Sequence, residues 1–210
     1  MGSARKRGNP AGAARRGGAR ARTLRIIGGR WRGRKLKFPA VADIRPTPDR
    51  VRETLFNWLG ARVGGARCLD LFAGSGALGL EALSRGAAHV SFVEHDPAAA
   101  RALRARLREW QAEHGVVVCS DALAFLAGAV APADLVFLDP PFAAGLLPDA
   151  ARALLRHGWL RPGALLYVEA PARAGPPQLP EGFVALKAKR AGEVGYHLYA
   201  YAPARAADLP

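Results

Sequence analysis

Short apolar runs and segments with helical spacing alternate along the chain from residue 67 to residue 168. A strand buried on both faces reads as a continuous apolar run, whereas an amphipathic helix repeats its apolar residues every three or four positions. Strict succession of the two types predicts a parallel sheet with helices on both faces. The predicted strands are 67–72, 90–93, 116–119, 135–138 and 164–168, and the predicted helices are 77–84, 98–113, 122–126 and 146–157.

After Pro171 the pattern changes to two strand-like stretches, 183–190 and 196–201, with no helix between them. The turn between them falls at 192–195, so they predict a terminal antiparallel pair. The expected fold class is therefore α/β, with a doubly wound, mostly parallel, seven-stranded Rossmann-like sheet.

The segment before the sheet has a different pattern of apolar and charged residues. Apolar residues and cations interleave over 23–38, with glycines at 28, 29 and 33, which predicts a small β-hairpin that packs on one face and presents cations on the other. A helix is expected at 50–59, with an apolar face at helical spacing. We expect three parts: a disordered basic leader (1–22), an RNA-binding extension made of the hairpin and this helix (23–60), and the sheet domain (61–203).

The positive charge is concentrated at the N-terminus. The chain carries a formal net charge of +14, and residues 1 to 42 contain thirteen Lys or Arg and no Asp or Glu. A basic arm of this kind favours a polyanion, most commonly nucleic acid, and arginines beside glycine turns suit RNA backbone and unstacked bases. Two alternatives stay open: charges that only protect a hairpin edge from aggregation, and helix arginines that pair with Glu53 or solvent. The candidate RNA contacts are Arg25, Arg30, Arg32, Arg34, Lys35, Lys37, Arg45, Arg50 and Arg52.

The apolar runs and the cysteines bear on the cellular location and on metal binding. No apolar run approaches the roughly 20 residues of a membrane-spanning helix, and the N-terminus lacks the apolar core of a signal peptide, so we expect a cytoplasmic protein with no membrane partner. Cys68 and Cys119 lie in separate apolar runs without metal-ligand spacing, which predicts buried, reduced thiols and no metal site. Nothing in the pattern requires more than a monomer.

The run at 135–138 ends in Asp139-Pro140-Pro141-Phe142. Two prolines stop a strand, because proline fixes φ and offers no N–H to a neighbouring strand. The resulting rigid corner carries a carboxylate that can accept a hydrogen bond from an exocyclic amine and a ring that can stack on the attached base. The alternative is an ordinary strand exit with an acidic residue and a core Phe.

Three other acids lie at the ends of predicted strands. Open α/β sheets bind ligands at the carboxyl ends of their strands, where Asp70, Glu94 and Asp121 would meet around a glycine-rich turn. The turn also fits a dinucleotide fingerprint, but Asp70 would oppose a pyrophosphate and suits a cationic ligand such as S-adenosylmethionine. In that interpretation Glu94 accepts the ribose hydroxyls and Asp121 the adenine amine. The expected cofactor contacts are Asp70, Phe72, Ala73, Gly74, Ser75, Gly76, Glu94, His95 at the pocket rim, Asp121, Ala122 and Asp139.

This set of pocket residues resembles that of the class I S-adenosylmethionine-dependent methyltransferases. Within that superfamily, residues 25–29, 45–47 and 50–57 resemble the RsmD family, the guanine-N2 methyltransferases of small-subunit ribosomal RNA. The resemblance covers about residues 23–201 and leaves the leader outside.

The resemblance implies an enzyme that methylates a guanine of 16S rRNA, as naked RNA or in an assembling 30S particle. The flipped guanine would stack on Phe142 and present its 2-amino group to the Asp139 carboxylate and the Pro140 carbonyl. The catalytic set would be Asp139, Pro140, Pro141 and Phe142. Three other functions remain open: methylation of adenine N6, a non-catalytic RNA-binding assembly protein, and a small NAD-dependent reductase.

Overall fold

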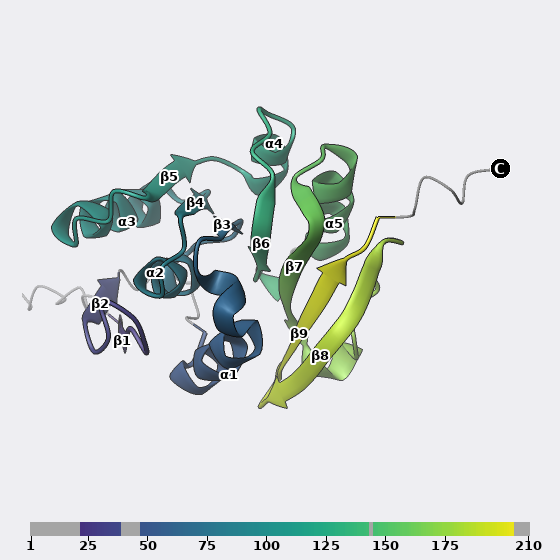
Figure 1. Ribbon diagram of the computed structural model, residues 1–210, viewed down its shortest axis with the longest axis horizontal. Helices are drawn as coiled ribbons and strands as arrows, with labels where there is room; N and C mark the ends of the chain where they lie inside the picture. Colours follow the sequence, from purple (N-terminus) through teal and green to yellow (C-terminus); the bar gives the residue numbers. More distant parts are fainter. Residues whose placement is uncertain (1–21, 39–46, 143–144, 204–210) are drawn as a thin grey trace, which may run out of the picture.

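The computed structural model describes residues 22–38, 47–142 and 145–203, so most of the predicted leader and Arg45 lie outside the described residues. Seven strands form one sheet in the order β5-β4-β3-β6-β7-β9-β8, which confirms the predicted doubly wound fold (Figure 1). The first five strands of this order are parallel, and β9 is antiparallel to both β7 and β8. The sheet strands are β3 (Arg67–Asp70), β4 (His89–Glu94), β5 (Gly115–Cys119), β6 (Ala133–Leu138), β7 (Leu160–Pro171), β8 (Phe183–Ala191) and β9 (Val194–Tyr201).

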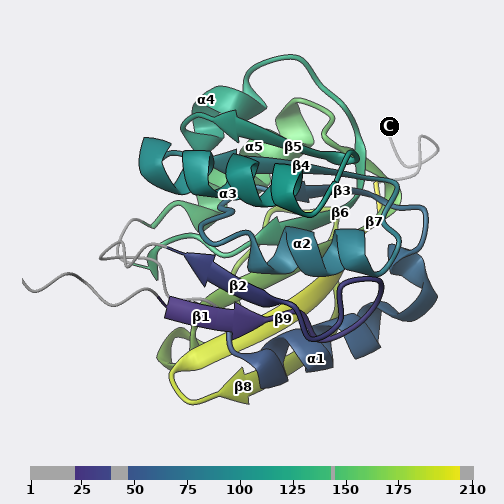
Figure 2. The ribbon, with the colours of Figure 1, turned by 90° about the vertical axis from the view of Figure 1, so that its left-hand side faces the viewer.

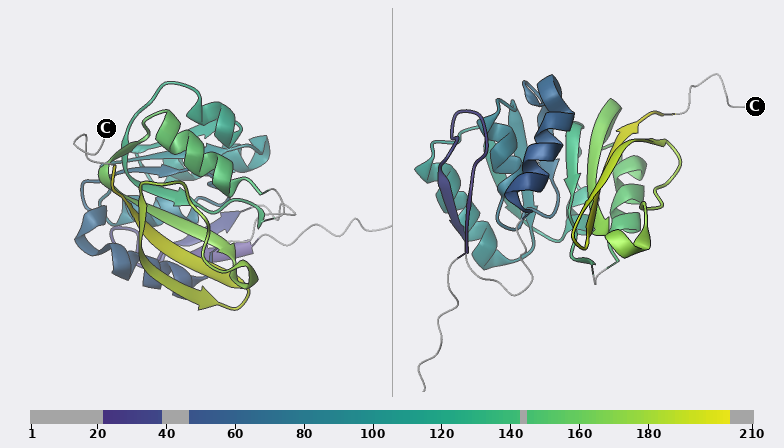
Figure 3. Two further views of the ribbon diagram at one scale, coloured as in Figure 1. Left: turned by 90° about the vertical axis from the view of Figure 1, so that its right-hand side faces the viewer. Right: turned by 90° about the horizontal axis from the view of Figure 1, so that it is seen from below.

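Helices cover both faces of the sheet, as the apolar strands require. One core layer lies between the sheet and α1 (Asp49–Leu59), α2 (Ala77–Ser84) and α3 (Pro97–Glu109). The other lies between the sheet and α4 (Ala122–Leu126) and α5 (Leu147–Arg156). Figure 3 shows α5 together with the hairpin β8–β9 on the side of the molecule away from β1 and β2. Short 3-10 turns follow α1 and β7, at Gly60–Val63 and Ala172–Ala174.

The predicted N-terminal hairpin is present, with β1 (Arg22–Arg25) antiparallel to β2 (Lys35–Phe38). Figure 2 shows it lying against α2 and near α1. Its apolar side chains Leu24, Ile26, Trp31 and Leu36 belong to the same core layer as α1, α2 and α3. The hairpin is therefore packed into the body of the protein and is not a separate unit hung on a linker.

Several boundaries differ from prediction. The largest difference is at β7, which spans Leu160–Pro171 where 164–168 was predicted. The strand predicted at 67–72 ends at Asp70, where the glycine-rich turn begins. The helix predicted to reach residue 113 ends at Glu109, because Gln111 has a φ of 51° and the amide of Ala112 donates back to the carbonyl of Leu107. This left-handed stop is a Schellman motif with glutamine in the position that glycine usually takes, so composition gave no signal for it.

The two cysteines were both predicted to be buried, but the structure buries only one of them. Cys68 is buried and free, as predicted, and burial raises the pKa of its thiol to about 12. Cys119 is free but exposed, because β5 is the edge strand of the sheet and one side of it has no neighbour. The prediction of two buried thiols is thus wrong for Cys119.

Candidate active site

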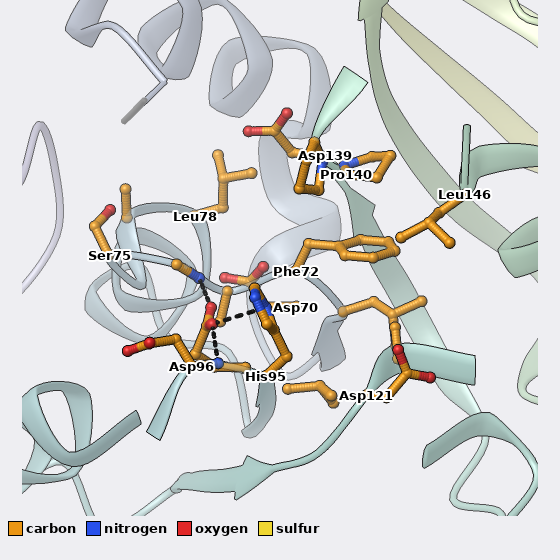
Figure 4. Close-up of a pocket in the computed structure, with 18 of the residues that line it drawn as sticks. Asp70, Phe72, Ser75, Leu78, His95, Asp96, Asp121, Asp139, Pro140 and Leu146 are labelled. Carbon is orange, nitrogen blue, oxygen red and sulfur yellow. Dashed lines mark hydrogen bonds and ion pairs between the residues drawn. The ribbon is translucent and has the colours of Figure 1, made fainter. Parts of the chain in front are cut away.

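A cavity of about 390 Å³ opens at the carboxyl ends of the parallel strands (Figure 4). Its size is within the range of small-molecule sites. Every predicted catalytic and cofactor-contact residue lines it except Gly76. The structure adds eight lining residues that the sequence interpretation did not place there: Thr47, Leu71, Ala77, Leu78, Val93, Asp96, Ser120 and Leu146.

Two glycines of the turn between β3 and α2, Gly74 and Gly76, serve different structural purposes. Gly74 has a φ of 52° and lines the cavity, which lets the backbone approach a ligand. Gly76 has a φ of 76° and is the N-cap of α2, and a Cβ there would lie 2.5 Å from Leu103 of α3. Gly76 is therefore needed for helix packing, and its predicted role as a cofactor contact is not supported by its position.

Asp70 is 3% exposed at the end of β3. It accepts a 3.0 Å hydrogen bond from the amide of Gly79, in the first turn of α2. Burial raises the pKa of Asp70 to about 7, with a smaller contribution from the charge of Glu94, and the Gly79 hydrogen bond acts in the opposite direction. No ion pair to Asp70 occurs within the described ranges, so a cationic group entering the cavity would stabilise its ionised form.

Glu94 joins the end of β4 to the glycine turn. One carboxylate oxygen accepts from the amide of Gly74 at 2.7 Å and the other from the amide of Asp96 at 2.7 Å. His95 Nδ1 lies 3.2 Å from the same carboxylate, while its side chain is 76% exposed, so His95 sits at the rim as predicted. The oxygen that accepts from Gly74 has no second partner among the described residues and retains a lone pair, so Glu94 can still accept from a ligand hydroxyl.

Asp121 follows β5 and is the N-cap of α4. Its carboxylate accepts from the amides of Leu123 and Ala124 at 2.9 and 3.0 Å. The residue lines the cavity and is exposed, so the cap holds the carboxylate at the edge of the site. Asp121 thus has a structural duty that the sequence interpretation did not include.

All four residues of the Asp139-Pro140-Pro141-Phe142 corner line the cavity. Pro140 is buried and Phe142 is 43% exposed, which leaves its ring open to a stacking partner. Burial raises the pKa of Asp139 well above the ordinary range, and the charges of Glu169 and Asp70 act in the same direction. The corner therefore combines a carboxyl group of high proton affinity with an accessible aromatic ring.

Three residues near Asp139 were not among the predicted site residues: Thr47, Tyr167 and Glu169. The hydroxyl of Thr47, just before α1, lies 3.0 Å from Glu169 and 3.5 Å from Asp139. Tyr167 on β7 donates to Glu169 at 2.8 Å. A usable signal existed, because Glu169 is an acid near the end of an apolar strand, like the three acids that were selected.

The basic hairpin presents most of its predicted cations to solvent. Arg30, Arg32, Arg34 and Lys35 are exposed, and so are Arg25 and Arg50. The guanidinium of Arg34 also lies over Trp110, at 5.7 Å from the ring centroid. Of Lys37 only the backbone is described.

Arg52 is a correction to the predicted RNA-binding set. It is fully buried on α1 and donates to Asp49 at 2.6 Å and to the carbonyl of Arg25 at 2.7 Å. It also lies 3.4 Å from Glu81 of α2. A helical pattern cannot distinguish a buried ion pair from an exposed charge, so the sequence assigned this guanidinium to the surface.

Neither a metal cluster nor a membrane-spanning helix is found in the part of the chain that the structure describes. No three His, Cys, Asp or Glu side chains there are grouped so as to hold a metal ion. None of the described helices has both the length and the apolar character to cross a bilayer.

Comparison with known proteins places this site in a family. A family model described as "Conserved hypothetical protein 95" matches residues 24–200. The chain is 50% identical over 176 residues to ribosomal RNA small subunit methyltransferase D of Escherichia coli K12, covering 84% of this chain and 89% of that protein. The corresponding protein of Haemophilus influenzae is 45% identical over 180 residues, covering 84% of this chain and 93% of that protein.

Solved structures agree with the sequence comparison. A putative methyltransferase, yhhF, from Escherichia coli has a TM-score of 0.79 at 47% identity and covers 86% of this chain and 98% of that chain. An RNA methyltransferase from Salinibacter ruber, solved with S-adenosyl-L-homocysteine, shares the fold at a TM-score of 0.52 and 18% identity, covering 79% of this chain and 99% of that chain.

Proposed function

The chain belongs to the RsmD family of ribosomal RNA small subunit methyltransferases, and we propose that it transfers a methyl group from S-adenosylmethionine to the exocyclic N2 amine of a guanine in 16S rRNA. The observation that carries the proposal is the meeting of the Asp139–Phe142 corner with three strand-end acids around one cavity. The acids Asp70, Glu94 and Asp121 suit a ligand with an ammonium group, a ribose and an adenine amine.

The residues of the cavity fit this cofactor. The ionisation of Asp70 is held back by burial without a cation, and a cofactor ammonium would supply that cation. Gly74 allows close backbone approach, and Glu94 retains a lone pair for a ribose hydroxyl. Bound there, S-adenosylmethionine supplies an electrophilic methyl group on a sulfonium.

The chain's own contribution to the reaction is positioning and proton acceptance. Asp139 and the carbonyl of Pro140 accept hydrogen bonds from the two N–H groups of the amine, while Phe142 stacks on the flipped base. The nitrogen lone pair forms the new N–C bond as the C–S bond breaks and its electron pair stays on sulfur. The nitrogen then loses a proton, which the Asp139 carboxylate can accept.

The basic hairpin supports RNA as the substrate. Its exposed cations are held on the body by buried Leu24, Ile26, Trp31 and Leu36, so phosphate contacts there can orient RNA relative to the cavity. We infer further that the enzyme acts as a monomer in the cytoplasm, on 16S rRNA either free or within an assembling 30S particle.

The test is methyl transfer from labelled S-adenosylmethionine to small-subunit RNA and to subunits lacking the modification, followed by nucleoside analysis. We expect N2-methylguanosine. Asp139→Ala should lower turnover by about 10³-fold, because the amine loses its acceptor, with cofactor affinity changed only slightly.

Other products would separate the remaining functions. N6-methyladenosine would retain the cavity and corner but contradict guanine as the target, since the corner can hold any exocyclic amine. Cofactor binding without transfer to any RNA would favour a non-catalytic binding protein. Full turnover by the Asp139→Ala enzyme would contradict the role given to the corner.

A further inference from the structure

Asp139, which is partly exposed to the cavity, has as a neighbour a second carboxylate that the proposed mechanism does not use. Glu169, near the end of β7, is 4% exposed. The hydroxyl of Thr47 lies between the two acids, 3.0 Å from Glu169 Oε1 and 3.5 Å from Asp139 Oδ2. Neither acid is in an ion pair anywhere in the described ranges.

The hydrogen bonds favour negative charge on Glu169. Its Oε1 accepts from the hydroxyl of Tyr167 at 2.8 Å as well as from Thr47. A threonine hydroxyl has a single proton, so at these distances it donates to Glu169 and leaves Asp139 with the weaker contact. Two donors stabilise a carboxylate, so of the pair Glu169 keeps its charge more readily and Asp139 takes the proton more readily.

We propose that Glu169 and Thr47 are positioning residues that act through Asp139, the Glu169 charge making Asp139 a proton acceptor and the Thr47 hydroxyl fixing the distance between the two acids. This inference rests on the proposed amine methylation. After the N–C bond forms, one N–H bond breaks, its electron pair stays on nitrogen, and the proton joins a carboxylate oxygen of Asp139.

A neighbouring anion matters because an ordinary aspartate is a weak base at neutral pH. An acceptor works best when its pKa lies near the working pH. A fixed negative charge beside Asp139 raises its affinity for the proton without occupying the face that meets the substrate.

Other groups also act on the pair, and the experiment has to separate them. Asp70 of β3 raises the pKa of Asp139. Tyr167 donates to Glu169, and its own pKa is raised by burial, then by Glu169 and Asp139, and least by Tyr196 of β9. Saturating cofactor keeps Asp70 in one state, and neither tyrosine is changed. What remains variable is the Glu169 charge and the Thr47 hydroxyl.

The experiment is the pH dependence of single-turnover methyl transfer, measured at saturating cofactor for two variants with opposite expected effects. Glu169→Gln keeps a hydrogen-bond acceptor but removes the charge, so the pKa of Asp139 falls and the acid limb should move to lower pH by about one unit. Thr47→Val keeps the volume but removes the donor. Because the Thr47 hydrogen bond lowers the pKa of both Asp139 and Glu169, its loss raises the proton affinity of the pair, and the acid limb should move to higher pH.

Matched controls make the result specific. Thr47→Ser should retain the wild-type midpoint, and Glu193→Gln, at an exposed acid of the β8–β9 turn, should leave the profile unchanged. A merely structural role would lower the rate at every pH without moving the midpoint.

Three outcomes decide the matter. Opposite shifts in the two variants support the inference. Midpoints that stay fixed, or that move in the same direction, overturn it while leaving the proposed function intact. Absence of methyl transfer by the wild-type enzyme would contradict the proposed function, and this inference with it.

Discussion

Two buried glutamates, Glu81 and Glu169, have opposite surroundings. Glu81 on α2 is fully buried and accepts from Arg85 at 2.7 Å and from the backbone amides of Ile27 and Gly28 at 2.8 Å. Glu169 is nearly as buried, but its donors among the described residues are both hydroxyls, those of Thr47 and Tyr167. Glu81, whose charge is balanced by an arginine, lies where the hairpin packs on α2. Glu169, whose charge is not balanced by a cation in the described residues, contacts Thr47, which lines the cavity.

The difference follows from the cost of burying charge. A buried carboxylate is tolerated structurally when cations and amides surround it, as at Glu81 with Arg52 and Arg85. Without a cation its pKa rises, which is costly for stability but useful for proton transfer or cation binding. Asp70, Asp139 and Glu169 are all of this second kind.

Glu81 is one of the residues that join the N-terminal extension to the sheet domain. It links the hairpin loop to α2 directly and to α1 through Arg52. Beside it, a Cβ on Gly29 would lie 1.9 Å from the carbonyl of Ser84, and the amide of Arg30 donates to that carbonyl at 2.7 Å. Hairpin and helix are thus packed as closely as glycine allows.

The largest effect on stability is expected from Glu81→Ala. It leaves Arg52 buried without its α2 partner and removes the acceptor of two hairpin amides, so unfolding free energy should fall by about 3–5 kcal/mol. Urea unfolding measures it. Glu53→Ala, at an exposed acid of α1, is the matched control and should change little. Equal losses of unfolding free energy in the two variants would contradict the role of Glu81 in linking the hairpin to α2.

Asp70→Asn should have a smaller, pH-dependent effect on stability. Because Asp70 has a pKa of about 7 in the folded protein against 3.8 for a free side chain, the folded state holds its proton more tightly. Its stabilising contribution is complete below about pH 4 and is lost as pH rises through 7, a change of up to about 4 kcal/mol.

The variant should therefore match the wild type near pH 4 and exceed it in stability at pH 8, when cofactor-free proteins are compared by urea unfolding. The other uncompensated acids are present in both proteins and cancel in the difference. If the variant gains the same stability at every pH, the pKa of Asp70 is not raised in the folded protein.

The smallest effect on the folded protein, and a specific one on binding, is expected from neutralising the hairpin. Replacing Arg30, Arg32, Arg34 and Lys35 with Gln should leave stability nearly unchanged, since these side chains are exposed. RNA affinity should fall, and the slope of log affinity against log salt should flatten by roughly 0.7–0.9 for each phosphate that the hairpin no longer neutralises.

The control carries the same number of neutralised cations elsewhere, at exposed Arg101, Arg108, Arg152 and Arg156. A salt slope that falls equally in both variants would contradict a specific RNA surface on the hairpin.

The sequence by itself determined most of the fold. The helices at 77–84 and 122–126 were predicted with their observed bounds, and the two hairpins and the seven strands were found at the right places. The physical reason is that burial on both faces makes each parallel strand an apolar run, and glycine and proline mark the ends. The corner at Asp139 and the acids of the cavity follow from the same rule, since ligand sites lie at strand ends.

Tertiary structure alone decided which charges are compensated. Arg52 and Arg50 are two positions apart on one helix, yet one is buried against Glu81 and the other is exposed. Thr47 and Glu169 are 122 residues apart and meet only because Thr47, just before α1, lies against the carboxyl-terminal part of β7. Local pattern encodes burial and periodicity, whereas the partner of a buried charge depends on which distant elements pack together.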